Sequence, residues 1–194
     1  MATRAKEREL LPHYDNKLQY YSPSDGPDLF AIMELADAPT HGHMIDIGCG
    51  DGRAYEYAAA HGMDYTGVDY SPRRISLARE LYGQMHTKER RPGFLCGDLY
   101  EALPHIHHGH ELAFCCEVLE HLEEPELIWE QMQRLVRQPK GRNGLVVCTC
   151  PVNMPYKAHL QVYRTDADIK AAFKPSFIRR YRTVKREHFV FGWS

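Results

Sequence analysis

A chain of 194 residues with 43% hydrophobic content is long enough to bury one good core, and we expect a single folded domain. The formal charge of −2 gives no overall attraction to nucleic acid or to an anionic membrane. We find no apolar run near the roughly 20 residues that cross a bilayer, and the charged segment 1–9 does not resemble a secretory signal. Six cysteines, several of them in predicted core strands, are typical of reduced thiols. Together these features predict a cytoplasmic protein.

Hydrophobic patterning predicts alternating strands and helices after an N-terminal extension over residues 1–27. The expected strands are 44–47, one that ends at residue 69, 94–96, 112–116 and 145–150, with two β-rich runs at 177–184 and 189–193. The expected helices are 28–36, 53–61, 72–82, 125–136 and 166–173. This alternation predicts an α/β domain over residues 28–194 with a doubly wound, mostly parallel sheet.

The most informative segment is 44–52, where an apolar stretch ends in Asp46. Three alternating glycines follow, namely Gly48, Gly50 and Gly52. The order is typical of a strand, a tight turn and a helix N-terminus that together bind a nucleotide-like ligand. Glycine permits a positive φ and lets a ligand approach where a Cβ would collide. The segment therefore predicts a nucleoside-cofactor site.

A second acid, Asp69, ends the next predicted strand. A carboxylate there can accept hydrogen bonds from both ribose hydroxyls, each worth roughly 1.5–3 kcal/mol because the acceptor is charged. Asp69 could instead cap the following helix. However, Ser71 precedes a proline at the first helical position and can cap that helix itself, which leaves Asp69 free.

The glycine turn differs from the G-x-G-x-x-G fingerprint of dinucleotide-binding folds, although NAD binding stays as an alternative. With Asp46 two residues before its first glycine, the turn resembles motif I of the class I S-adenosylmethionine-dependent methyltransferases. The resemblance continues in order along the chain, at Asp69, Cys96-Gly97-Asp98-Leu99, Glu117-Val118-Leu119-Glu120-His121 and 141–150. It implies a Rossmann-like methyltransferase fold with seven strands, of which the last is antiparallel.

The same resemblance implies how the cofactor would be held. Asp46 would lie near its methionine portion, Asp69 would hold the ribose, and Asp98 would accept from the adenine amino group. Glu117 would line the floor near the sulfonium. The implied cofactor-binding residues are Asp46, Gly48, Cys49, Gly50, Gly52, Asp69, Tyr70, Asp98, Leu99 and Glu117.

The segment 117–121 poses the main chemical question. If it is helical, Glu117 and His121 share one face. We take both as the candidate catalytic residues. His121 could act as a general base, since the ordinary pKa of an imidazole lies near the operating pH. A divalent ion such as Mg²⁺ or Mn²⁺ is the alternative, with Glu117, Glu120, His121 and His159 as candidate ligands. This residue pattern resembles that of ubiquinone-pathway O-methyltransferases and of small-RNA 2′-O-methyltransferases. Methyltransferases without a metal share the pattern too, so we favour a site without metal.

The acceptor is expected beneath a lid that residues 10–27 and the loop 152–164 form together. Their aromatic side chains suit a flat organic molecule, and the set is Tyr14, Tyr20, Tyr21, Tyr156, His159 and Tyr163.

Three other clusters are interpreted as structural. The histidine-rich tract 105–110 is expected to be a solvated loop. Four cysteines on neighbouring strands, Cys115, Cys116, Cys148 and Cys150, are expected to be buried thiols rather than zinc ligands, since the first two point to opposite faces. The basic segment 170–186 is expected to be a solvated face, with an RNA-binding patch as the alternative.

We therefore predict an S-adenosylmethionine-dependent methyltransferase that acts on a small organic acceptor by O- or N-methylation. The first alternative is a metal-assisted RNA ribose 2′-O-methyltransferase, and the second is a cofactor-binding protein without catalytic activity.

Overall fold

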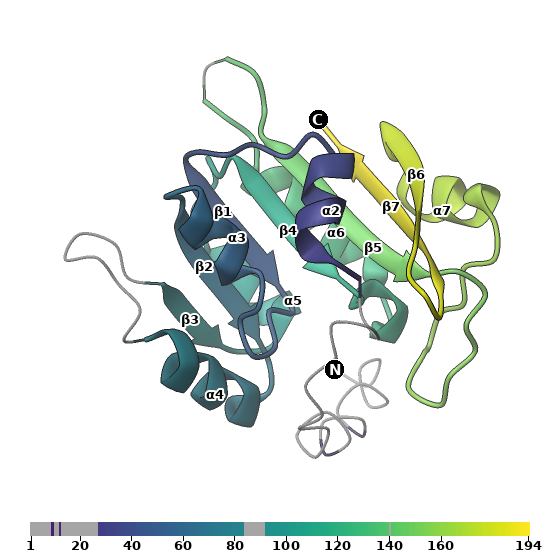
Figure 1. Ribbon diagram of the computed structural model, residues 1–194, viewed down its shortest axis with the longest axis horizontal. Coiled ribbons are helices and arrows are strands. Elements are labelled where there is room, and N and C mark those ends of the chain that lie inside the picture. Colours follow the sequence, from purple (N-terminus) through teal and green to yellow (C-terminus); the bar gives the residue numbers. More distant parts are fainter. Residues whose placement is uncertain (1–8, 10–11, 13–26, 84–91, 140) are drawn as a thin grey trace.

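The computed structural model describes residues 9, 12, 27–83, 92–139 and 141–194 (Figure 1). Its strands are β1 (His43–Ile47), β2 (Asp64–Asp69), β3 (Gly93–Cys96), β4 (Leu112–Cys116), β5 (Leu145–Pro151), β6 (Phe177–Arg182) and β7 (Glu187–Trp193). Its α-helices are α2 (Leu29–Leu35), α3 (Tyr55–Ala60), α4 (Pro72–Tyr82), α5 (Leu99–Ala102), α6 (Pro125–Leu135) and α7 (Asp166–Phe173). Two 3₁₀ turns, η1 (Leu103–His105) and η2 (Leu119–His121), complete the set.

The seven strands form one sheet in the order β3-β2-β1-β4-β5-β7-β6. Strands β1 to β5 pair in parallel, whereas β7 is antiparallel to both of its neighbours. This confirms the predicted Rossmann-like sheet with its antiparallel last strand. Because β7 runs in reverse, its first residues lie at the edge of the sheet where the parallel strands end.

Helices cover both faces of the sheet (Figure 1). On one face, α2, α3 and α4 pack through buried residues such as Ile32, Tyr57 and Ile75. On the other face, α6 and α7 pack through Ile128 and Phe173. Ligands of such folds bind outside the carboxyl ends of the strands. The two cores hold the sheet from both faces and so fix the positions of these strand ends.

The helix boundaries differ from the prediction where turns intervene. Helix α3 begins at Tyr55 rather than residue 53, because the glycine-rich turn continues through Ala54. Helix α5 was not predicted, since its four residues are too few to show a helical period. Ser71 caps α4 as predicted, with its hydroxyl accepting from the Arg74 amide at 3.2 Å.

The three clusters interpreted as structural are mostly confirmed. Cys115, Cys148 and Cys150 are buried in the α6 side of the core, whereas Cys116 packs on the opposite side. All six cysteines of the chain are free thiols. The expectation of a solvated 105–110 tract is wrong for His110, which is 5% exposed and whose pKa burial lowers to about 4.

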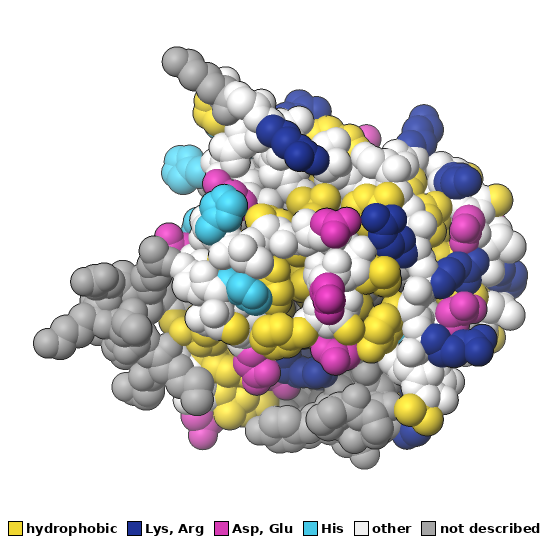
Figure 2. Space-filling model, turned by 45° about the horizontal axis from the view of Figure 1, so that its top comes forward, with side chains coloured by type: hydrophobic (Ala, Val, Ile, Leu, Met, Phe, Trp, Pro, Cys, Tyr) yellow, Lys and Arg dark blue, Asp and Glu magenta, His cyan; other side chains and the backbone are white. Residues whose placement is uncertain are grey.

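The basic C-terminal segment carries acidic partners. Arg180 bridges Asp166 at 2.6 Å and Glu187 at 3.5 Å, and Arg179 lies 3.6 Å from Asp37. Figure 2 shows basic and acidic side chains interspersed along the right-hand side of the molecule. This mixed surface agrees with a solvated face rather than a single-sign patch for RNA.

Candidate functional site

The glycine turn after β1 depends on backbone shapes that a side chain would prevent. Gly48 has a φ of 73°, and a Cβ there would collide with the Val118 side chain. The amides of Gly48 and Cys49 donate to the Val68 carbonyl at 2.8 and 3.0 Å. The end of β1 is therefore fixed against β2, with Gly50 and Gly52 also at positive φ.

Asp46 lies on β1 just before this turn and is 3% exposed. Its Oδ2 accepts a hydrogen bond from the Tyr65 hydroxyl at 2.6 Å. The pKa of Asp46 is raised to about 7, chiefly by burial and also by the nearby carboxylates of Asp69 and Asp51, although the Tyr65 hydrogen bond lowers it. Tyr65 was not singled out from the sequence. It would have been found only by placing β1 beside β2.

Asp69 occupies the end of β2 as predicted, but it is already engaged. Its Oδ2 accepts from the Gly50 amide and its Oδ1 from the Ser71 amide, each at 2.9 Å. The expectation that capping by Ser71 leaves Asp69 free is therefore wrong. A carboxylate offers about four lone-pair positions, so these two bonds are compatible with further ones to a ligand.

Asp98 is half-buried and begins helix α5. Its Oδ1 accepts from the Tyr100 amide at 2.9 Å, which makes it the N-cap. Its neighbour Leu99 is 6% exposed and packs into the core. The paired backbone of β2 and β3 brings Asp69 beside Cys96, the last residue of β3, and Asp98 follows two residues later.

Glu117 follows β4 in the left-handed conformation, with a φ of 57°. Its Oε1 accepts from the Thr149 hydroxyl at 3.0 Å and lies 3.1 Å from Nδ1 of His188. Neither Thr149 nor His188 was predicted as a site residue. Thr149 was detectable as the hydroxyl side chain within an otherwise apolar strand, whereas His188 gave no local signal.

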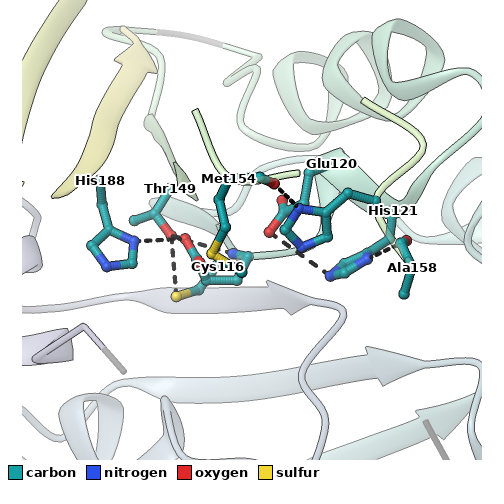
Figure 3. Close-up of polar contacts among 9 residues, drawn as sticks. Cys116, Glu120, His121, Thr149, Met154, Ala158 and His188 are labelled. Carbon is teal, nitrogen blue, oxygen red and sulfur yellow. Dashed lines mark hydrogen bonds and ion pairs between the residues drawn. The ribbon is translucent and has the colours of Figure 1, made fainter. Parts of the chain in front are cut away.

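A second cluster lies along the same edge of the sheet, next to Thr149 and His188 (Figure 3). Glu120, His121 and His159 place one potential ligand atom each within 4.8 Å of one another. The two side chains of Glu117 and His121 do not share a helical face, because η2 begins only at Leu119 and the turn at Glu117 directs its carboxylate to Thr149. The structure thus groups three of the four candidate metal ligands and leaves Glu117 apart.

The histidines of this cluster have defined tautomers. Nδ1 of His121 donates to the Ala158 carbonyl at 2.8 Å, and Nδ1 of His159 donates to the Met154 carbonyl at 2.7 Å. Because a carbonyl can only accept, each neutral ring carries its lone pair on Nε2, the form that binds metals.

Glu120 is 1% exposed, and neither of its carboxylate oxygens has a hydrogen-bond partner among the described residues. Burial, and then the charge of Glu117, raises the pKa of Glu120 well above its usual range. Its Oε1 lies 3.8 Å from Nε2 of His121, which is beyond hydrogen-bond range. A buried carboxyl without a hydrogen-bond partner must hold a proton or face a cation. The donor set of one carboxylate and two imidazoles fits a divalent transition metal such as Mn²⁺ or Zn²⁺.

The loop 152–164 is attached to η2. The amides of Leu160 and Gln161 donate to the Glu120 carbonyl at 2.8 and 2.9 Å. Tyr163, expected in an aromatic lid, is instead 7% exposed and packs 5.6 Å from Phe173 in the core. That part of the lid prediction is wrong. The other expected lid residues Tyr14, Tyr20 and Tyr21 lie outside the described residues.

This fold and this sheet edge define a nucleoside-cofactor-binding α/β domain. The sequence matches the model of the family described as "Methyltransferase domain" over residues 45–143. The chain belongs to this family, within the class I S-adenosylmethionine-dependent methyltransferases.

Curated relatives carry O-methyltransferase names. The chain is 31% identical over 118 residues to a ubiquinone biosynthesis O-methyltransferase of Coxiella burnetii, a match that covers 61% of this chain and 47% of the relative. A Pectobacterium atrosepticum protein of the same name is 27% identical over 173 residues, which are 83% of this chain and 69% of that protein. The chain spans about half the length of the first of these relatives.

Solved structures show the same fold. Magnesium protoporphyrin IX methyltransferase from Synechocystis PCC 6803, with bound S-adenosylhomocysteine, aligns with a TM-score of 0.70 over 96% of this chain and 98% of that one, at 14% identity. Within the described residues, none of the helices has the length and apolar character that crossing a membrane would require.

Proposed function

We propose that this chain binds S-adenosylmethionine at the ends of β1, β2 and β3 and transfers its methyl group to a hydroxyl of a small phenolic acceptor. The observation that carries the proposal is the glycine turn held against Asp69 through the Gly50 amide. The acceptor class is proposed from the names of the curated relatives. We further propose a cytoplasmic location, consistent with six free thiols.

The residues present fit this cofactor by their chemistry. Asp46, Asp69 and Asp98 offer acceptor oxygens at the ends of the three strands, which suits the amino group and hydroxyls of an adenosyl amino acid. When bound, the cofactor supplies a sulfonium methyl group that is already reactive. The chain would orient the acceptor oxygen toward that methyl and exclude water, and near-attack geometry of this kind would supply about 7–11 kcal/mol of barrier lowering.

Calorimetric titration with S-adenosylmethionine and S-adenosylhomocysteine tests the proposal. Micromolar binding of both compounds, together with methylation of 3,4-dihydroxybenzoate, is the expected result. Absence of binding would refute the proposal and favour the NAD alternative, which titration with NAD would then check. Tight binding without transfer to any phenol or RNA would indicate the non-catalytic alternative.

A second candidate, metal-assisted transfer, is favoured by the buried Glu120 carboxyl beside His121 and His159. These three residues would hold the ion, which would supply a Lewis acid for an acceptor hydroxyl. Repeating the titrations with EDTA and then with Mn²⁺ separates the two candidates. Metal-dependent methylation of the phenol would place the ion in the small-molecule reaction, whereas metal-dependent methylation of RNA alone would favour the ribose methyltransferase.

We also propose that residues 1–27 close over the acceptor, together with loop 152–164. Deletion of residues 1–24 is expected to impair turnover and to leave the affinity for S-adenosylhomocysteine intact. Wild-type turnover after this deletion would remove the N-terminal part of the lid.

A further inference from the structure

The direction of β7 brings a histidine to the acceptor side of the sheet edge. His188 is the second residue of β7, and its register partners are Pro151 at the end of β5 and Tyr181 on β6. Its side chain is fully buried. A strand parallel to β5 would place its first residues at the opposite edge, so the antiparallel pairing is what brings His188 to Glu117.

The Glu117 carboxylate is held at one oxygen and not at the other. Oε1 receives the Thr149 hydroxyl at 3.0 Å and faces Nδ1 of His188 at 3.1 Å. Oε2 has no hydrogen bond within the described part of the chain, and the side chain keeps 15% of its surface exposed. The backbone is fixed as well, because the Glu117 amide donates to both the carbonyl and the hydroxyl oxygen of Thr149 at 3.2 Å.

The imidazole must be a donor in this arrangement. A carboxylate oxygen accepts, so the hydrogen of a neutral His188 ring lies on Nδ1. The other nitrogen, Nε2, is buried and has no partner among the described residues. Buried polar atoms normally find hydrogen-bond partners, and a purely structural side chain at this position would avoid leaving one unpaired. The contact between Nδ1 and Glu117 therefore accounts for an imidazole at this buried position.

We propose that His188 is a positioning residue, which together with Thr149 fixes Glu117 so that its Oε2 accepts the proton of the methyl acceptor. This inference rests on the proposed function and adds a role for a strand that the family match over 45–143 does not include.

The step balances without a further reactant. The acceptor O–H bond breaks and its proton passes to Oε2 of Glu117. The acceptor oxygen forms the bond to the methyl carbon, and the electron pair of the broken methyl–sulfur bond returns to sulfur. His188 keeps its Nδ1 hydrogen on Oε1 throughout, and the proton on Oε2 then leaves to solvent.

Two substitutions of His188 distinguish the contribution of Nδ1 from that of Nε2. In His188→Asn the amide nitrogen falls near the position of Nδ1 and can still donate to Glu117, whereas in His188→Gln it falls near Nε2. We expect His188→Asn to keep kcat for 3,4-dihydroxybenzoate within about threefold of wild type, and His188→Gln to lower kcat about ten- to a hundredfold through misplacement of Glu117. KM and the affinity for S-adenosylhomocysteine should change less than twofold or so in both. His107→Asn and His107→Gln, in an exposed loop, are the matched controls.

Equal rates for the two His188 variants, or a loss confined to cofactor affinity, would overturn the inference. Because a buried substitution can prevent folding, a second measurement uses the wild-type protein. Nitrogen-15 NMR of the imidazoles should show His188 protonated at Nδ1. In a separate variant, Thr149→Val should lower kcat less than His188→Gln does. A His188 ring protonated at Nε2 would refute the contact. If the wild-type protein binds S-adenosylhomocysteine but does not methylate the phenol, the proposed acceptor fails, and the tautomer of His188 still decides this inference.

Discussion

The two halves of the sheet edge are built in different ways. On the β1–β3 side, the ligand-facing surface is mostly backbone shaped by glycine, and the backbone amides of Gly50 and Ser71 hold the carboxylate of Asp69. On the β4–β7 side, side chains from distant segments meet. Glu117 contacts Thr149 and His188, and His121 contacts Ala158.

This difference indicates which half is constrained by the cofactor and which half can vary with the acceptor. Backbone conformations that admit one invariant ligand tolerate few substitutions. A cluster of side chains can be changed one residue at a time while the sheet persists, which is how one fold supports many substrates. Mutations on the cofactor side should therefore impair both folding and binding, whereas mutations on the acceptor side should mainly impair turnover or metal binding.

The largest effect is expected for Gly48→Ala. The new Cβ would collide with Val118 and hold a residue at positive φ, so the free energy of unfolding should fall by about 2–5 kcal/mol. Urea denaturation measures this loss. Gly50→Ala is the matched control, because its φ is 54° but the nearest atom to its Cβ would be Nη1 of Arg74 at 3.5 Å. It should cost only the conformational part, about 1–2 kcal/mol. Equal losses would show that the contact with Val118 is unimportant.

Asp69→Ala comes next. The affinity for S-adenosylmethionine should fall roughly ten- to a hundredfold or more, which corresponds to about 1.5–3 kcal/mol for the lost ribose contacts. Stability should fall too, by about 1–3 kcal/mol, because the amides of Gly50 and Ser71 lose their acceptor. Calorimetry and urea denaturation measure the two losses separately. Unchanged affinity with reduced stability would make Asp69 a turn residue without a cofactor role.

On the acceptor side, His159→Ala should lower the affinity for Mn²⁺ at least about tenfold, since it removes one of three ligands. Affinity for S-adenosylhomocysteine should stay within about twofold of wild type, because the ring lies on the acceptor half. Titration with Mn²⁺ followed by electron paramagnetic resonance measures the loss, with the exposed His107→Ala as control. If the wild-type protein binds no Mn²⁺, Glu120 holds a proton instead, and the metal-assisted candidate fails.

The same contrast explains what could be predicted from the sequence. The glycine turn and the alternation of strands and helices follow from residues close together in the chain, and the structure confirms the predicted fold. The prediction that residues 28–194 form one unit and the cofactor roles of Asp46, Asp69 and Asp98 stay predictions until binding is measured. The acceptor side depended on tertiary pairing. The left-handed turn at Glu117 separated it from His121, and Tyr163 left the expected lid for the core.

The smallest expected change in affinity depends on pH and on the Asp46 carboxyl, whose pKa is raised to about 7. A raised pKa in the folded state means that the protonated form stabilises the fold. This contribution is fully present below about pH 4 and is lost as the pH rises through about 7, with a slope of at most about 1.4 kcal/mol per pH unit. His110, with its lowered pKa of about 4, acts in the opposite direction over an overlapping range. The difference between wild type and Asp46→Asn therefore isolates Asp46, and urea denaturation from pH 4 to pH 8 measures it.

Binding should follow the reverse trend, because a positively charged cofactor favours the ionised carboxyl. Between pH 6 and pH 8 the affinity for S-adenosylmethionine should rise about three- to tenfold in the wild type and stay nearly constant in Asp46→Asn. A rise that is equally strong in both would assign the titration to another group, and the acid before the glycine turn would then belong with Tyr65 to the support of β1 rather than to the ligand surface.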